Sequence, residues 1–125
     1  SSISAWRAFP GISYYGSSKT YLRSFAQSLR SELAMYGVQV TCLAPGATAT
    51  GLYGSTGVPV VTATRLGVMM DAEAVAAAGL RAMFRGEAQC VPGVLARAMA
   101  VGSTWTPQPV VDWLRRRAPW LRPRP

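Results

Sequence analysis

The sequence contains no histidine, and this absence removes several common kinds of catalytic site. A Ser-His-Asp triad, a Cys-His pair and every histidine metal site are excluded. Proton chemistry must therefore use tyrosine, lysine, aspartate, glutamate or cysteine. The only two cysteines, Cys42 and Cys90, stand singly inside apolar runs, which is typical of buried free thiols rather than of a disulfide or a metal site. We predict no bound metal.

Long hydrophobic runs are also lacking. No uninterrupted apolar run approaches the roughly 20 residues that a membrane-spanning helix needs, and no basic-then-apolar leader opens the chain. We therefore expect a cytoplasmic protein. The 125 residues are the size of one domain or of part of one. The chain starts with serine on what reads as the end of a strand, so we expect further residues upstream.

Acidic residues are few. The chain has five of them and thirteen basic residues, which gives a net charge of +8. Such an excess suits nucleic acid or an anionic membrane surface. We expect no nucleic-acid binding, because five arginines fall in the last eleven residues and the others are scattered without an aromatic-basic array. For the basic tail two interpretations stay open: weak contact with a membrane surface, or packing on its own domain with solvated arginines.

A helical period of apolar residues runs from about residue 14 to residue 36, and Gly37 stands where a helix C-cap belongs. The apolar positions are Leu22, Phe25, Ala26, Leu29 and Leu33. Residues 38–44 form a β-branched, mostly apolar run that Pro45-Gly46 stops, which predicts a buried strand.

A second helix is predicted to start with Asp71 as its N-cap and to end at Gly86, and the sequence QCVPGV then favours a short strand. The long connection between the two predicted units is rich in glycine and threonine. The order helix, strand, loop, helix, strand predicts an α/β fold with a parallel sheet.

Lysine is almost absent as well, because twelve of the thirteen basic residues are arginine and the single lysine is Lys19. It stands four residues after Tyr15, and counting back along the apolar stripe puts both on the face directed at the sheet. A charge there is costly unless it is paired or the helix end opens into a cleft. The alternative is that Lys19 extends into solvent and Tyr15 packs as an amphipathic core residue.

The surroundings of this pair follow a definite order. Ser2 precedes Tyr15 by thirteen residues, in SSISAW followed by YYGSSK, and the next predicted strand ends in PGATAT. This arrangement resembles the classical short-chain dehydrogenase/reductase family. The resemblance covers about residues 1–93 and matches the C-terminal, catalytic half of a family member. Residues 94–125 would be a C-terminal extension, a helix followed by a basic tail rich in proline, arginine and tryptophan.

The resemblance implies the C-terminal half of a Rossmann-like doubly wound parallel sheet. The Gly-rich turn that binds the cofactor pyrophosphate and the catalytic asparagine of the family belong to the other half and are not in these residues. We therefore expect this polypeptide by itself to be inactive or unstable, and the complete protein to be a homo-oligomer.

The resemblance also implies an oxidoreductase that transfers a hydride between NAD(P) and a carbonyl or alcohol substrate. Tyr15 would be the acid or base, Lys19 would favour its phenolate form and bind the nicotinamide ribose, and Ser2 would donate a hydrogen bond to the substrate oxygen. These residues do not distinguish NAD from NADP. Two other functions stay open: a non-catalytic relic or scaffold that keeps the fold, and a basic membrane-surface module.

Further contacts are implied for the turn after the strand. Pro45 and Gly46 would approach the cofactor, Thr48 through its backbone and Thr50 through its side chain. Position 48 is more often aliphatic in the family, a departure that leaves a backbone role intact. Residues 51–67 occupy the place of the mobile substrate flap, and their apolar members favour an apolar or lipid-like carbonyl compound. These members are Leu52, Tyr53, Val58, Val60, Val61 and Leu66, with Leu52 and Tyr53 as candidate substrate contacts.

Overall fold

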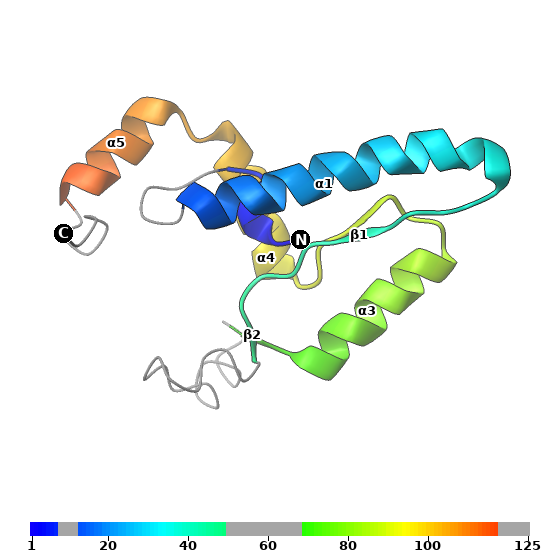
Figure 1. Ribbon diagram of the computed structural model, residues 1–125. Helices are drawn as coiled ribbons and strands as arrows, with labels where there is room; N and C mark the ends of the chain where they lie inside the picture. Colours follow the sequence, from blue (N-terminus) through cyan, green and yellow to red (C-terminus); the bar gives the residue numbers. More distant parts are fainter. Residues whose placement is uncertain (8–12, 50–68, 118–125) are drawn as a thin grey trace.

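The computed structural model describes residues 1–7, 13–49 and 69–117 (Figure 1). Its helices are the short 3-10 helices η1 (Ile3–Ala5) and η2 (Ala34–Tyr36) and the α-helices α1 (Ser13–Leu33), α3 (Ala72–Phe84), α4 (Val94–Trp105) and α5 (Gln108–Arg117). Its strands are β1 (Cys42–Leu43), β2 (Thr48–Ala49), β3 (Met70–Asp71) and β4 (Gln89–Cys90). Both strand pairs, β1 with β4 and β2 with β3, are parallel. The predicted α/β class with parallel strands is confirmed for the described residues.

Strand β1 has partners on both of its edges. Toward β4, the amides of Cys42 and Ala44 donate to the carbonyls of Ala88 and Cys90. On the opposite edge, the nitrogen of Ser1 donates to the Leu43 carbonyl (2.8 Å) and the amide of Ile3 donates to the Pro45 carbonyl (3.1 Å). The chain direction is the same in all three segments, so residues 1–3 continue the parallel arrangement beside β1.

Pro45 explains why residues 1–3 are not a regular strand. A complete parallel ladder would also need an amide at position 45 to donate back to Ser1, and proline has no amide hydrogen. The carboxyl ends of the three segments still meet at one edge, where Ser2, Pro45-Gly46 and Gly93 follow one another across the sheet.

Helices α1 and α3 lie on either side of β1 (Figure 1). The guanidinium of Arg30, in α1, donates to the carbonyls of Val40 (2.9 Å) and Gly86 (2.7 Å), and so joins the helix to both chain segments that lead into β1 and β4. On the other side, Gly79 of α3 lies so close to Leu43 that a Cβ at position 79 would be 2.9 Å from a Leu43 methyl group. Helix, sheet and helix therefore form the layers expected of an α/β fold.

The predicted end of the first helix is confirmed. Helix α1 passes into η2, and Gly37 follows with a φ of 71°, a left-handed conformation that glycine adopts without strain. The predicted strand over residues 38–44 is shorter than expected, because only Cys42 and Leu43 belong to β1. The Val40 carbonyl accepts from Arg30 and the Thr41 hydroxyl donates to the Glu87 carbonyl, so side chains replace strand pairing there.

The predicted buried stripe on α1 is wrong in part. Leu22 and Phe25 are 42% and 50% exposed, and Tyr15 is 48% exposed, whereas Gly16 is buried. The reason lies in the side chains that face the sheet. Arg23 donates to the Gln89 side chain of β4, and Arg30 donates to the carbonyls of Val40 and Gly86. Thr20 instead joins α1 to η1, since it donates to the Ala5 carbonyl.

The described residues bury mainly small side chains. The best-buried apolar residues include Ala5, Ala44, Ala82, Ala100 and Val111, and no large side chain of the described part is fully buried. Exposed large apolar residues occur on α1, α3, α4 and α5 and include Tyr21, Phe25, Met35, Leu80, Phe84, Met99, Trp105 and Trp113. Within the described ranges, no helix has the length and apolar character needed to span a membrane.

The two cysteines are buried free thiols, as predicted. Cys90 lies under α3 with its Sγ 3.7 Å from the Ala78 carbonyl oxygen. Burial raises the pKa of the Cys90 thiol, and the neighbouring Glu87 carboxylate raises it further. A neutral, apolar thiol is thus part of the packing between β4 and α3.

Asp71 is the N-cap of α3, as the sequence predicts. Its carboxylate accepts hydrogen bonds from the amides of Glu73 (3.0 Å) and Ala74 (3.2 Å). We expect Asp71→Ala to lower the free energy of unfolding by about 1 kcal/mol, the usual contribution of an N-cap side chain. Urea denaturation measures this loss, and Asp71→Asn should retain most of the stability because asparagine also caps. Equal losses in both variants would contradict the capping role.

Candidate active site

The candidate site lies at the edge where the parallel segments end. Ser2, the Pro45-Gly46 turn and Gly93 come to this edge from the three neighbouring segments. Open α/β sheets bind their ligands outside the carboxyl ends of the strands, because loops leave the sheet there and backbone groups are accessible. The first turns of α1 lie against the same edge, since the Ser1 hydroxyl donates to the Lys19 carbonyl (2.9 Å).

Ser2 is buried, with 7% of its surface exposed. It has extended backbone angles and is the N-cap of η1, where its Oγ accepts from the Ser4 amide (3.3 Å). A hydroxyl that accepts in this way keeps its own hydrogen for donation. Ser2 is therefore held in place and retains a donor.

Tyr15 and Lys19 occupy successive turns at the start of α1. The ammonium of Lys19 lies over the Tyr15 ring, with Nζ 5.2 Å from the ring centroid, a distance at which a cation and an aromatic ring attract each other. Tyr15 is about half exposed and Lys19 has intermediate burial. The expectation that both lie on the buried side is incorrect for Tyr15, because the first turn of α1 is placed at the open edge of the sheet.

The Lys19 ammonium has no hydrogen-bond or salt-bridge partner among the residues that the structure describes. Within the described residues, the one ion pair joins Arg85 and Glu87, which are far from Lys19 in the sequence. Three ammonium donors thus stand next to a tyrosine that is accessible from solvent. This combination suits the binding of a hydroxyl-bearing ligand.

The turn after β1 is fixed by short contacts. The Pro45 carbonyl accepts from Ile3, and the Thr48 hydroxyl donates to the Gly46 carbonyl (3.2 Å). Thr48 then pairs with Met70, and in this register the Met70 amide donates to Ala47 (2.9 Å) rather than to Thr48. The backbone groups of Thr48 therefore point away from β3.

The remaining predicted site residues, Thr50, Leu52 and Tyr53, lie outside the described residues. The same holds for the rest of the predicted flap, residues 51–67.

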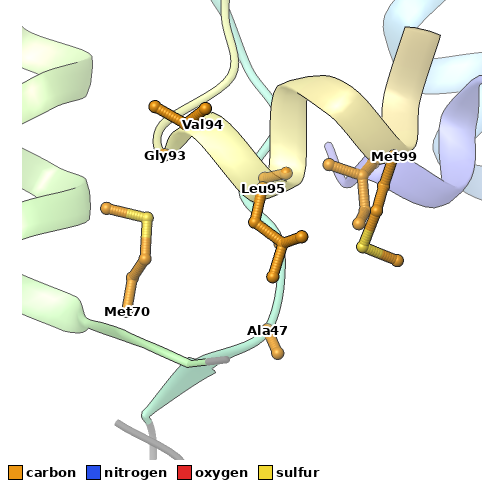
Figure 2. A pocket seen from close by; sticks show the side chains of 9 residues that line it. Ala47, Met70, Gly93, Val94, Leu95 and Met99 are labelled. Carbon is orange, nitrogen blue, oxygen red and sulfur yellow. The ribbon is translucent and has the colours of Figure 1, made fainter. Parts of the chain in front are cut away.

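A cavity of about 240 Å³ opens at this edge between α4 and the strands (Figure 2). Figure 2 shows Leu95 and Met99 of α4 on one side of it and Met70 of β3 on the other. Ile3, the neighbour of Ser2, also lines it, together with Gly46. All nine lining residues are apolar, so this space favours hydrocarbon over charged or strongly polar groups.

Gly93 has a φ of 87°, in the positive region that glycine adopts without strain. A Cβ there would lie 2.9 Å from the Met70 sulfur, so the flexible Met70 side chain would have to shift. This close approach lets α4 start beside β3 and so forms one wall of the cavity.

The sequence interpretation missed this wall, formed by Met70, Leu95, Ala96 and Met99. One signal was available: VPG after a short strand repeats the strand-end pattern of APG at Pro45, and both turns lead to the same edge. The partner across the cavity, Met70, could not be found in this way because it belongs to the start of the α3 unit.

Comparisons with known proteins agree with the geometry. The model of the short chain dehydrogenase family matches residues 1–58. The oxidoreductase claN of Passalora fulva is 34% identical over 85 residues, which cover 68% of this chain and 39% of that protein. Dehydrogenase/reductase SDR family member 4 of Bos taurus is 48% identical over 46 residues, 37% of this chain and 16% of that protein.

A third relative is the glycine betaine reductase ATRR of Emericella nidulans, 37% identical over 75 residues, which cover 60% of this chain and 5% of that protein. The chain thus spans at most 39% of the length of these three curated relatives. No solved structure gives a significant match. The segment matched by the family model contains Ser2, Tyr15, Lys19 and the Pro45-Gly46 turn, and the chain belongs to the short-chain dehydrogenase family.

Proposed function

We propose that residues 1–93 are the catalytic, C-terminal half of an NAD(P)-dependent oxidoreductase that interconverts a carbonyl compound and an alcohol. The observation that carries this proposal is the pair Tyr15 and Lys19 on successive turns, with Nζ 5.2 Å from the ring, at the sheet edge that also holds Ser2. The printed names of the relatives, an oxidoreductase and a dehydrogenase/reductase among them, support the reaction class.

In this proposal a nucleotide-binding half of the same polypeptide completes the sheet. The shares of the relatives that the chain covers, 39% and less, are consistent with a half molecule. The large apolar side chains exposed on α1 and α3 give such a half a surface to bury. We call the polypeptide with both halves the completed enzyme, and residues 94–125 are its C-terminal extension.

The residues present fit a nicotinamide cofactor. Lys19 has ammonium donors without a partner in the described residues, and the Thr48 backbone points away from its neighbouring strand. Lys19 and Tyr15 would hold the nicotinamide ribose, and the Pro45-Gly46 turn with Thr48 would hold the carboxamide. When bound, the cofactor supplies a hydride to the carbonyl carbon in reduction and accepts one in oxidation.

In this proposal, side chains of this chain bind the substrate oxygen and transfer a proton to or from it. In reduction, Ser2 donates a hydrogen bond to the carbonyl oxygen, and the Tyr15 hydroxyl transfers its proton to that oxygen as the carbon–oxygen π electrons move onto it. The positive charge of Lys19 stabilises the phenolate that Tyr15 leaves behind. In oxidation the phenolate takes the hydroxyl proton of the alcohol. Ser2 keeps the oxygen in position in both directions.

The most direct test of this function follows nicotinamide oxidation by the completed enzyme with a panel of ketones and aldehydes. Turnover with at least one carbonyl compound is the expected outcome, and apolar substrates should outperform small polar sugars because the cavity is lined by apolar residues. A folded completed enzyme that binds the cofactor and turns over none of them would instead favour a non-catalytic relic or scaffold that keeps the fold.

The tail takes no part in this chemistry. Val111 of α5 is buried, whereas Trp113, Arg116 and Arg117 are exposed, and Arg117 lies 5.0 Å from the Trp113 ring centroid. We expect deletion of residues 112–125 from the completed enzyme to leave the rate of the chemical step within a few-fold of its original value. Effects should be confined to oligomerisation, solubility or sedimentation with anionic vesicles.

Single-turnover kinetics of the truncated and intact enzymes measure the chemical step. If truncation destroyed turnover in a protein that stays folded by circular dichroism, the tail would have to close the substrate site.

A further inference from the structure

We propose that the cavity beside α4 holds the hydrocarbon part of an apolar carbonyl or alcohol substrate, and that Ala96 limits the length of hydrocarbon that fits. This inference rests on the proposed function, because the reacting carbonyl is placed at Ser2 and Tyr15. It assigns chain-length selectivity to α4, a helix outside the segment that the family model matches.

The cavity begins at the residue that follows Ser2. Ile3 lines the cavity and follows directly after Ser2, and Gly46 lines it at the end of β1. A substrate whose oxygen accepts from Ser2 would therefore have an apolar cavity beside the next residue of the chain. Its carbon chain would run between the strand ends and α4.

The residues that line the cavity have exposed apolar surface. Leu95 and Met99 are 53% and 54% exposed, so both have apolar surface that a ligand could cover. Met70 faces them from β3, and methionine side chains adapt their shape to a flexible apolar ligand. Burial of each additional methylene should strengthen binding about three- to fourfold for as long as the chain fits.

Ala96 lines the cavity at the place where α4 comes close to the strand ends. It is only 9% exposed, and its Cβ would be 3.3 Å from a Cβ placed on Gly46. A larger side chain at position 96 would take up space beside Gly46 and Ile3, which line the same cavity. In this proposal the small side chain of Ala96 leaves that space to the hydrocarbon.

The first experiment measures kcat/KM of the completed enzyme for straight-chain aldehydes that differ by one methylene. We expect kcat/KM to rise about three- to fourfold per methylene up to a limiting length. Ala96→Leu should shift that limit to shorter aldehydes with little change for the shortest, and Met99→Ala, which enlarges the cavity, should shift it to longer ones. Val101→Leu, at a residue of the same helix that is 60% exposed and outside the cavity lining, is the matched control and should change nothing.

The second experiment needs no catalysis. In the same protein, a long-chain alcohol below its micellar concentration should slow the peroxide oxidation of Met99, read by peptide mass spectrometry. Met35, which is 80% exposed and lies in η2 beyond the end of α1, should be oxidised at an unchanged rate.

These readouts separate the two proposals. Absence of turnover with every aldehyde, together with protection of Met99, would overturn the proposed function and leave the hydrocarbon site standing. Turnover with an unshifted length limit in both Ala96→Leu and Met99→Ala would overturn the assignment to α4. The same conclusion would follow if the alcohol failed to slow the oxidation of Met99 relative to that of Met35. If Ala96→Leu failed to fold, Met99→Ala and the oxidation experiment would still decide the question.

Discussion

In the completed enzyme, Tyr15→Phe should lower turnover by about two to four orders of magnitude, the contribution typical of a positioned acid or base. The substitution removes the hydroxyl hydrogen that the mechanism delivers to the substrate oxygen and leaves the ring beside Lys19. Cofactor affinity should stay nearly unchanged, because only one hydroxyl contact to the ribose is lost and Lys19 keeps its own. Stopped-flow absorbance of the nicotinamide gives the rate, and fluorescence titration gives the affinity.

Tyr14 provides the matched control for this variant. It is the preceding residue of the same helix and is 94% exposed, so Tyr14→Phe removes a hydroxyl from the same turn without touching the site. We expect its turnover to equal that of the parent enzyme. Unchanged turnover in Tyr15→Phe, or an equal loss in both variants, would contradict the acid–base role of Tyr15.

The second large effect is expected at Lys19. Lys19→Arg should be nearly as harmful as Lys19→Met, with a loss of about 10²-fold in kcat/KM, the size expected when a reacting group is misplaced by ~1 Å. An ammonium is a compact point charge, whereas guanidinium is a wide planar fork that would stack on the Tyr15 ring with its donors in other positions. Steady-state kinetics of the two variants test this directly.

Arg23 offers a control for the reverse exchange on the same helix. Its guanidinium lies 4.4 Å from the Trp6 ring centroid and donates to the Gln89 side chain (3.4 Å), so it joins α1 to η1 and β4. We expect Arg23→Lys to affect stability more than kcat/KM. If Lys19→Arg kept most of its activity, the choice of lysine at this one position in an arginine-rich chain would have no catalytic meaning.

Local signals in the sequence predicted much of the fold. The period of α1, the left-handed Gly37 at its end and the Asp71 cap of α3 depend on residues within a few positions of one another. Such signals are read without knowledge of the rest of the molecule. The short strand in QCVPGV was likewise predicted, because β4 is bounded by turn residues.

The extent of burial could not be predicted, because it depends on partners elsewhere in the chain. The stripe at Leu22 and Phe25 reads as a core face, but the hydrogen bonds of α1 to β4 and to the segments that lead into β1 and β4 are made by Arg23 and Arg30. Arginine in such a position looks like a solvated residue in sequence. Its long side chain reaches backbone carbonyls of distant segments, a contact with no sequence signature.

The candidate site also has a part that was predicted from the sequence and a part that was not. Ser2, Tyr15 and Lys19 were proposed because their order and spacing resemble those of short-chain dehydrogenases, with the serine at a strand end and the other two on the first turns of the next helix. The cavity was not predicted, since Ile3, Gly46 and Met99 become neighbours only through the parallel order of the sheet. Residues separated by about fifty positions along the chain form one wall there, and no local pattern connects them.

The central claim is that the site of Ser2, Tyr15 and Lys19 supports hydride transfer to a carbonyl carbon. The most direct measurement supplies the completed enzyme with a reduced nicotinamide cofactor deuterated at its transferable position and with an apolar aldehyde, and analyses the alcohol by mass spectrometry. We predict that the alcohol carries one deuterium on the former carbonyl carbon, and that Tyr15→Phe forms this product far more slowly. Alcohol without deuterium, or no alcohol from a folded enzyme that binds the cofactor, would contradict the account.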